Sequence, residues 1–176
     1  MFESEPEPVR VILTNDDIVF ARSLAHLRQD AKNSFLRNRK KVCDTDAIDL
    51  HYIGVLGEVA CGKYFCVDVD TTERIDGDKH EPDIFVNGHG CEVKATRRDD
   101  PHLIVEPYYD LRKADVLILC RVCEPAVDLL GCVSTLRFHC KHFLRPFGYG
   151  VKRAMFWKSL SNVNEILTRR RIEWPT

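Results

Sequence analysis

An Asn-Gly pair at positions 87 and 88 is the feature of this sequence that most constrains its fold. It stands between two strand-like segments, residues 82–86 and 89–96, both supplied with β-branched or apolar side chains. Both turn residues tolerate the positive φ angles of a two-residue type I′ turn, so Asn-Gly in this setting strongly predicts a β-hairpin. With a two-residue turn, Asp83 falls directly opposite Glu92 in the hairpin.

This register has a chemical consequence, because it places two carboxylates side by side. Directly opposed strand residues have Cβ atoms about 5 Å apart, and like charges at that distance are destabilising. A divalent cation between Asp83 and Glu92 would remove the repulsion. Side chains alternate along a strand, so Lys94 shares the face of Glu92, whereas the opposite face is apolar. A four-residue turn over residues 87–90 would instead pair Asp83 with Lys94, and the sequence leaves that register open.

Two long helices are predicted before the hairpin. Helical periodicity indicates the first over residues 16–33 and the second from about residue 45 to residue 63. On the second helix, Gly54, Glu58 and Gly62 fall on one stripe, four residues apart. Glycines beside a carboxylate let a helix approach another backbone closely, although each costs about 1 kcal/mol relative to alanine. The alternative is that Glu58 is solvent-exposed beside two poor helix formers.

The remaining segments complete an α/β pattern. Further strands are expected over residues 64–69, 114–120, 127–133 and 154–158, and helices over residues 135–143 and 161–170. This order predicts a three-layer α/β sandwich around a central mixed β-sheet, in a single domain over residues 13–176. Residues 1–12, acidic and punctuated by proline, are expected to form a frayed N-terminal arm.

The composition narrows the class of protein. Of the 176 residues 44% are hydrophobic and 30% are charged, and no segment reaches the roughly 18 uninterrupted apolar residues of a membrane span. We therefore expect no association with a membrane.

Eight cysteines occur without a secretory signal, and we expect them to be reduced thiols in the cytoplasm. A zinc site is the alternative, because thiolate pairs two residues apart are familiar ligands. Two of the six candidate ligands stand in apolar strands, where free cysteine packs as a small hydrophobe, and this favours buried thiols over zinc. The six are Cys120, Cys123, Cys132, Cys140, His139 and His142.

Pro82-Asp83, eight intervening residues and Glu92-Val93-Lys94, with Glu58 upstream on a helix, resemble the motifs of the PD-(D/E)XK superfamily of restriction-endonuclease-like nucleases. The order of elements over residues 45–140 is similar to that of small phage-type members. The resemblance implies a restriction-endonuclease-like core and a nuclease that cuts DNA with Mg²⁺, for which Mn²⁺ can substitute. A phage origin would place it in the cytoplasm of the host.

The resemblance also implies a role for each motif residue. Asp83 and Glu92 would ligate the metal ion, the carbonyl group of Val93 would add a ligand, and Glu58 would be a further ligand or a base. Lys94 would position or activate the attacking water. Oxygen ligands suit a hard ion such as Mg²⁺, which keeps several waters and needs only two or three carboxylates. Such an ion lowers the pKa of its water and neutralises charge that develops on the phosphate.

Basic clusters are the candidates for contact with the DNA backbone. The formal net charge is −1, so only local clusters can attract a polyanion. Residues 169–171 form one basic run. The other candidates are Arg37, Arg39, Lys40 and Lys41 in one cluster, and Thr96, Arg97 and Arg98 beside the motif lysine.

Two alternatives to a nuclease stay open. Asp83 and Lys94 could form an ordinary surface salt bridge, with Glu92 incidental. A DNA-binding or recombination accessory protein could have kept the fold and lost the chemistry, although the complete set of Asp83, Glu92, Lys94 and Glu58 favours an enzyme. The sequence does not distinguish an exonuclease from an endonuclease, or a monomer from a homodimer.

Overall fold

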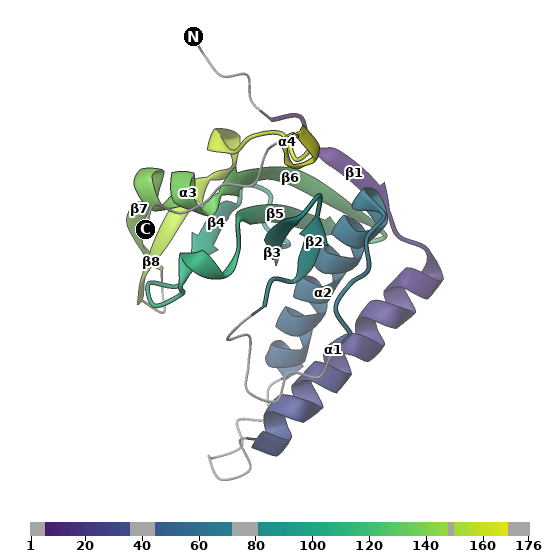
Figure 1. Cartoon of the computed structure of the whole chain (residues 1–176). Coiled ribbons are helices and arrows are strands. Elements are labelled where there is room, and N and C mark those ends of the chain that lie inside the picture. Colours follow the sequence, from purple (N-terminus) through teal and green to yellow (C-terminus); the bar gives the residue numbers. More distant parts are fainter. Residues whose placement is uncertain (1–5, 36–44, 72–80, 148–149, 169–176) are drawn as a thin grey trace.

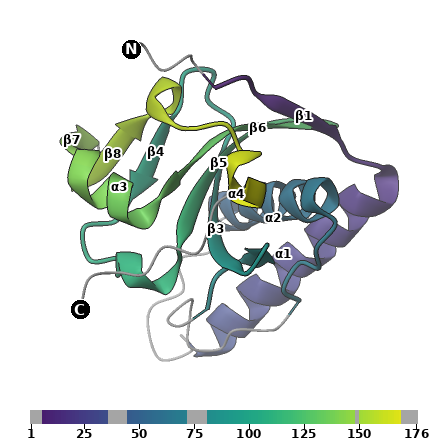
Figure 2. The same cartoon turned by 45° about the horizontal axis from the view of Figure 1, so that its top comes forward.

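Helices and strands alternate in layers in the computed structural model, which describes residues 6–35, 45–71, 81–147 and 150–168 (Figure 1). Helix α2 packs against one face of a five-stranded sheet, α1 packs on α2, and a smaller three-stranded sheet lies on the other side of the large sheet (Figure 2). The predicted α/β sandwich around a mixed sheet is confirmed. The elements are β1 (Val9–Ile12), α1 (Asn15–Phe35), α2 (Thr45–Phe65), β2 (Ile84–Val86), β3 (His89–Thr96), β4 (His102–Val105), η1 (Leu111–Lys113), β5 (Val116–Cys123), β6 (Ala126–Ser134), α3 (Thr135–Lys141), β7 (Phe143–Phe147), β8 (Gly150–Phe156), η2 (Trp157–Ser159) and α4 (Glu165–Thr168).

Strand β5 lies in the centre of the five-stranded sheet and separates two hydrophobic cores. The strand order is β1-β6-β5-β3-β2, with β3 and β5 parallel and the other neighbours antiparallel. Ile118 and Val122 pack toward α1 and α2, whereas Leu117 and Leu119 pack toward β4, β8 and α3. Full burial of each such side chain contributes roughly 2 kcal/mol. This explains why β5 is apolar at nearly every position.

The hairpin of β2 and β3 has the predicted two-residue turn. Asn87 and Gly88 take φ angles of 49° and 78°, as a type I′ turn requires. Val86 pairs with His89, and Ile84 pairs with Cys91. The four-residue alternative is excluded, and the ladder carries Asp83 toward Glu92.

Helix α2 approaches β3 through a glycine that differs from those predicted. A Cβ on Gly57 would lie 2.8 Å from the Cβ of Ala95, so only hydrogen fits at that contact. Gly62 does meet another backbone, because its Cβ would lie 2.9 Å from the carbonyl oxygen of Val67, but Gly54 has nothing within 4 Å. The expectation of close approach was therefore right for Gly62, wrong for Gly54, and missed Gly57.

The expected frayed arm is wrong for Val9–Ile12, which form strand β1. This strand pairs antiparallel with β6, and Val11 is buried. The Arg10 guanidinium donates to both carboxylate oxygens of Asp128, at 2.7 and 3.1 Å. The acidic, proline-rich composition predicted a frayed arm, but hydrogen bonding to β6, more than 100 residues away, stabilises these residues as a strand.

Residues 64–69 do not form the expected strand. Helix α2 continues through Phe65, and Cys66 then takes a φ of 55°. The N–H of Val67 donates to the carbonyl of Gly62 at 2.9 Å, which closes the helix end in a Schellman-type arrangement. The aromatic and β-branched residues that indicated a strand therefore continue and cap a helix.

Strand β7 was not predicted. Helix α3 ends at Lys141, two residues before the expected end, and Phe143–Phe147 then pair with β8. Strand β7 is an edge strand, where the missing N–H of Pro146 is tolerated. The second sheet has the order β4-β8-β7. Among the described residues no helix is long and apolar enough to cross a membrane.

Candidate active site

Asp83 lies at the outer edge of β3, one residue before β2 begins. Its Oδ2 accepts a hydrogen bond from the N–H of Val93 at 2.7 Å, and its own N–H donates to the carbonyl of Cys91 at 3.0 Å. These bonds fix the carboxylate beside the part of β3 that extends past the end of β2. Most of the side chain is buried, although part of it is accessible to solvent.

Glu92 and Lys94 lie on the same face of β3, as the alternation predicted. Glu92 is buried, and the Nζ of Lys94 donates to its Oε1 at 2.5 Å. The same Nζ lies 5.6 Å from the ring centroid of Tyr109, which provides a cation–π contact. The ion pair of Lys94 is therefore with Glu92, and the alternative of a plain Asp83–Lys94 surface bridge is wrong.

Glu58 is buried on α2 and held by a residue that the sequence did not reveal. Arg28 of α1 donates to both of its carboxylate oxygens, at 2.8 and 2.9 Å, and also to the backbone carbonyl of Asp70 at 2.9 Å. Only 6% of Glu58 is exposed, so the solvent-exposed alternative is wrong. A bidentate arginine of this kind is among the stronger side-chain contacts in proteins.

A signal for Arg28 exists in the sequence. Ala21, Leu24 and Ala25 are buried, and Arg28 continues their stripe along α1 at helical spacing. An arginine on the apolar face of a helix must find a carboxylate or enough polar atoms, because burial of an unpaired charge is costly. The sequence pattern therefore predicts an inward arginine, but it does not identify the partner.

The three carboxylates influence one another. Burial raises the pKa of Asp83 well above its ordinary value of 3.8, and the negative charges of Glu92 and Glu58 raise it further. The Val93 N–H and the Lys94 ammonium act in the opposite direction without cancelling the effect. Asp83 is therefore the carboxylate of this group whose negative charge is least compensated.

The donor set suits a hard divalent cation. Such an ion takes carboxylate oxygens and would relieve the repulsion on Asp83. It would compete with Lys94 for Glu92 and with Arg28 for Glu58, since each of these carboxylates already has a cationic partner. Accordingly, no three His, Cys, Asp or Glu side chains of the described ranges already stand at ligand spacing.

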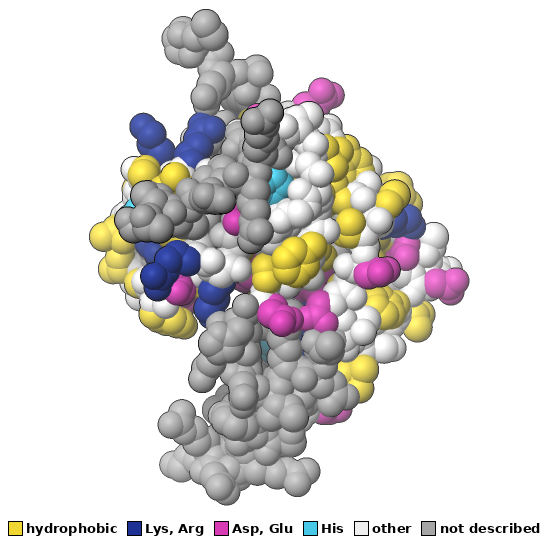
Figure 3. Space-filling model, in the orientation of Figure 1, with side chains coloured by type: hydrophobic (Ala, Val, Ile, Leu, Met, Phe, Trp, Pro, Cys, Tyr) yellow, Lys and Arg dark blue, Asp and Glu magenta, His cyan; other side chains and the backbone are white. Residues whose placement is uncertain are grey.

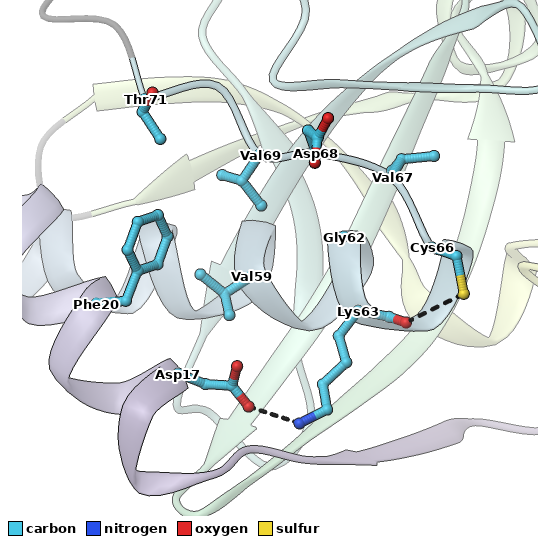
Figure 4. Close-up of a pocket in the computed structure, with 10 residues that line it drawn as sticks. All are labelled: Asp17, Phe20, Val59, Gly62, Lys63, Cys66, Val67, Asp68, Val69 and Thr71. Atoms are coloured by element: carbon cyan, nitrogen blue, oxygen red, sulfur yellow. Dashed lines mark hydrogen bonds and ion pairs between the residues drawn. The ribbon is translucent and has the colours of Figure 1, made fainter.

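Two hollows border this region. The first, of about 310 Å³, adjoins Asp83 and is lined by residues 67–70 and 81–85. A larger hollow of about 680 Å³ lies between α1 and the end of α2 (Figure 4), and the ion pair of Lys63 with Asp17, at 2.6 Å, crosses its floor. Because these two charges neutralise each other, the hollow beside Asp83 is the better candidate for chemistry.

The basic residues predicted to contact DNA are only partly placed. Arg97 binds both oxygens of Asp49, at 2.7 and 2.9 Å, and one oxygen of Glu124 at 3.0 Å. Arg98 is exposed, and its N–H donates to the hydroxyl of Thr96 at 3.3 Å. Arg97 is therefore engaged by acidic side chains. Arg37, Arg39, Lys40, Lys41 and residues 169–171 lie outside the described residues.

The cysteines of the zinc alternative are dispersed. Cys120 is buried with its Sγ 3.6 Å from that of Cys61, whereas Cys123 and Cys140 are exposed. Burial raises the pKa of the neighbouring Cys91 thiol to about 12, so this sulfur stays protonated. The strand thiols thus pack as small hydrophobes, as the sequence predicted.

Comparisons with protein-family models, with curated proteins and with solved structures found no match to this chain.

Proposed function

We propose that this protein is a metal-dependent nuclease that hydrolyses phosphodiester bonds of DNA. The observation that carries the proposal is the poorly compensated charge of Asp83, whose pKa is raised by burial and by the charges of Glu92 and Glu58, with Lys94 beside them. Carboxylates whose pKa is strongly raised by burial and by neighbouring negative charges occur more often at functional sites than elsewhere in folded proteins. The resemblance to PD-(D/E)XK nucleases gives the reaction class.

The chain's own groups have distinct tasks in this proposal. Asp83, Glu92 and Glu58, with the carbonyl of Val93, hold Mg²⁺ or Mn²⁺, which supplies Lewis-acid activation of water and phosphate. The Val93 N–H keeps Asp83 against the strand, and Arg28 keeps Glu58 from turning away. Lys94 presents its ammonium group to the scissile phosphate and orients the water that attacks it.

One observation favours a second candidate, a DNA-binding accessory protein without catalysis. Arg28 and Lys94 already neutralise Glu58 and Glu92, and a chain that had lost its metal would be stabilised by such internal pairs. In that case the protein would bind DNA, and addition of metal ions would have little effect on that binding.

The decisive experiment is a cleavage assay on single-stranded, linear duplex, circular and four-way-junction DNA, with Mg²⁺, with Mn²⁺ and with chelator. We expect metal-dependent cutting that falls by about 10²–10³-fold in Asp83→Asn, which removes a metal ligand, and in Lys94→Ala, which removes a cation aimed at the charge that develops on the phosphate.

Two matched controls lie close to the site. Lys113 has its Nζ at the same 5.6 Å from the Tyr109 ring, and Asp68 is an exposed carboxylate of the adjoining hollow. Lys113→Ala and Asp68→Asn should stay within about twofold of wild type. DNA binding without cutting under every metal condition would support the accessory protein and refute the nuclease.

A further inference from the structure

A long segment of the chain is basic and contains no acid. Between Asp128 and Glu165 the sequence has no aspartate or glutamate, although acidic and basic residues are nearly equal in number in the whole chain, at 27 and 26. The segment folds into the end of β6, α3, β7, β8 and η2. In Figure 3 most of the visible Lys and Arg side chains gather on the side of these elements. The basic residues of this segment are Arg137, Lys141, Arg145, Lys152, Arg153 and Lys158.

The β4-β8-β7 sheet has one aromatic face that is not covered by the core. Pairing places His102 opposite Phe156, and Phe143 opposite Ala154, all on this outer face. The ring of His102 lies 5.9 Å from that of Phe143 and 5.4 Å from that of Phe156. Phe143 is 42% exposed.

Cationic groups stand among these rings. The Arg145 guanidinium is exposed, lies 5.8 Å from the ring centroid of Phe147, and is 3.0 Å from Nε2 of His102. Burial and the Arg145 charge lower the pKa of His102, so its ring is neutral near pH 7. The opposite face of the sheet, with Leu103 and Met155, is buried against β5.

This combination of rings and cations matches the chemistry of unpaired nucleotides. Exposed aromatic rings stack on base faces, and neighbouring cations bind the phosphates, so affinity does not depend on sequence. A duplex hides its base faces and would find only the charges. A neutral apolar partner, by contrast, would gain nothing from the exposed Arg145, and the neighbouring Glu106 is already paired with Lys152.

We propose that the outer face of the β4-β8-β7 sheet binds single-stranded DNA, with Phe143, Phe147 and Phe156 stacking on bases and Arg145 contacting the backbone. This inference rests on the proposed function in taking DNA as the nucleic acid, and it names the strand form that the nuclease acts on. Binding at this face needs neither Asp83 nor a metal ion, so the two proposals can fail separately.

The test is fluorescence anisotropy with a labelled 20-nucleotide oligo-dT and a labelled 20-base-pair duplex, in chelator. We expect the full-length protein to bind the single strand more tightly than the duplex. Phe143→Leu keeps the apolar contact on Ala154 but removes the ring, and should weaken oligo-dT binding about tenfold. Arg145→Ala should lower the slope of log affinity against log salt by about 0.7, the value for one phosphate contact on a single strand.

A matched control exists on the other side of the molecule. Phe20 on α1 is 41% exposed, nearly the same as Phe143, and Arg22 is an exposed arginine of the same helix. Phe20→Leu and Arg22→Ala should leave oligo-dT affinity unchanged. Equal binding of single strand and duplex would overturn the proposal, as would wild-type affinity in both Phe143→Leu and Arg145→Ala. Tight oligo-dT binding by Asp83→Asn, in which we expect cutting to be strongly reduced, would support the binding face whether or not the protein proves to be a nuclease.

Discussion

Opposing electrostatic effects act on the ionised form of Asp83. Its carboxylate accepts a hydrogen bond from Val93, which favours the ionised form, yet burial and two neighbouring carboxylates raise its pKa. Ionisation of Asp83 therefore costs more in the folded chain than in the unfolded chain. A bound cation would reverse that balance, so one residue links stability, pH and metal affinity.

Asp83→Asn should make the protein more stable at pH 7 in chelator. Well below the unfolded pKa of 3.8, aspartate is protonated in both the folded and the unfolded chain, so the variant gains nothing. As pH rises past the unfolded pKa of 3.8, only the unfolded chain ionises fully, and wild type loses stability up to the raised folded pKa. Thermal unfolding by circular dichroism from pH 3.5 to 8 measures this difference, with about 2–4 °C expected for each kcal/mol gained.

Asp68→Asn is the control for this comparison, because Asp68 is exposed, and it should show no such trend. Addition of Mg²⁺ should raise the midpoint of wild type and not that of Asp83→Asn, since only a folded state that binds the ion is stabilised. If Asp83→Asn is less stable than wild type at pH 7 in chelator, ionised Asp83 does not destabilise the folded chain.

Sequence reasoning reached the site residues where local rules decide, and failed where distant contacts decide. The Asn-Gly turn sets the register that carries Asp83 toward Glu92, and strand alternation places Lys94 beside Glu92. The partner of Glu58 lies 30 residues away on another helix, and the helical stripe that marks Arg28 as an inward arginine does not identify Glu58 as its partner. The acidic partners of Arg97 were hidden for the same reason.

At the scale of elements, the position of α2 against β3 controls the site. Gly57 precedes Glu58 on the helix and touches Ala95 of β3, so the contact that positions the helix also positions the carboxylate. The two long helices and the hairpin were predictable because their periodicity and turn chemistry are strong. Strands β1 and β7 were not, because an edge strand is decided by the strand it pairs with.

Gly57→Ala should destabilise the protein and Gly54→Ala should not. The added methyl at position 57 would lie 2.8 Å from the Cβ of Ala95 and 3.2 Å from Cγ1 of Val93, and overpacking of this kind costs about 1–3 kcal/mol. At position 54 nothing lies within 4 Å, so alanine should gain up to about 1 kcal/mol of helix propensity. Urea denaturation of both variants gives the two free energies. Equal stability would show that α2 and β3 are packed less closely than described.

At the scale of the whole molecule, the proposed catalytic and binding regions belong to different sheets. Asp83 and Lys94 lie on the hairpin side of the five-stranded sheet, and the aromatic face belongs to β4, β8 and β7 (Figure 1). Lys94 points to the side of the large sheet on which the small sheet packs, because its strand partner Leu119 belongs to that core. Single-stranded DNA bound to the small sheet thus lies on the same side of the five-stranded sheet as Lys94.

Substrate length should therefore separate the two regions. Phe143→Leu is expected to lower kcat/KM about tenfold for long single-stranded DNA, since one stacked base is lost, and to leave hydrolysis of bis-p-nitrophenyl phosphate unchanged. Lys94→Ala should impair both substrates. If Phe143→Leu also loses activity on bis-p-nitrophenyl phosphate, the ring supports the catalytic site and does not bind single-stranded DNA.

The pairing of β1 with β6 constrains the order in which this protein can fold during its synthesis. Arg10 and Asp128 are 118 residues apart, so β1 leaves the ribosome long before the strand that completes its hydrogen bonds exists. Helices α1 and α2 also precede every strand of the sheet that covers them except β1. The apolar face that they turn to the sheet consequently stays uncovered until β3, β5 and β6 have been made. Exposed apolar surface and unpaired strand edges of this kind favour aggregation, so the interval before β6 is made is the one in which the nascent chain is most exposed to it.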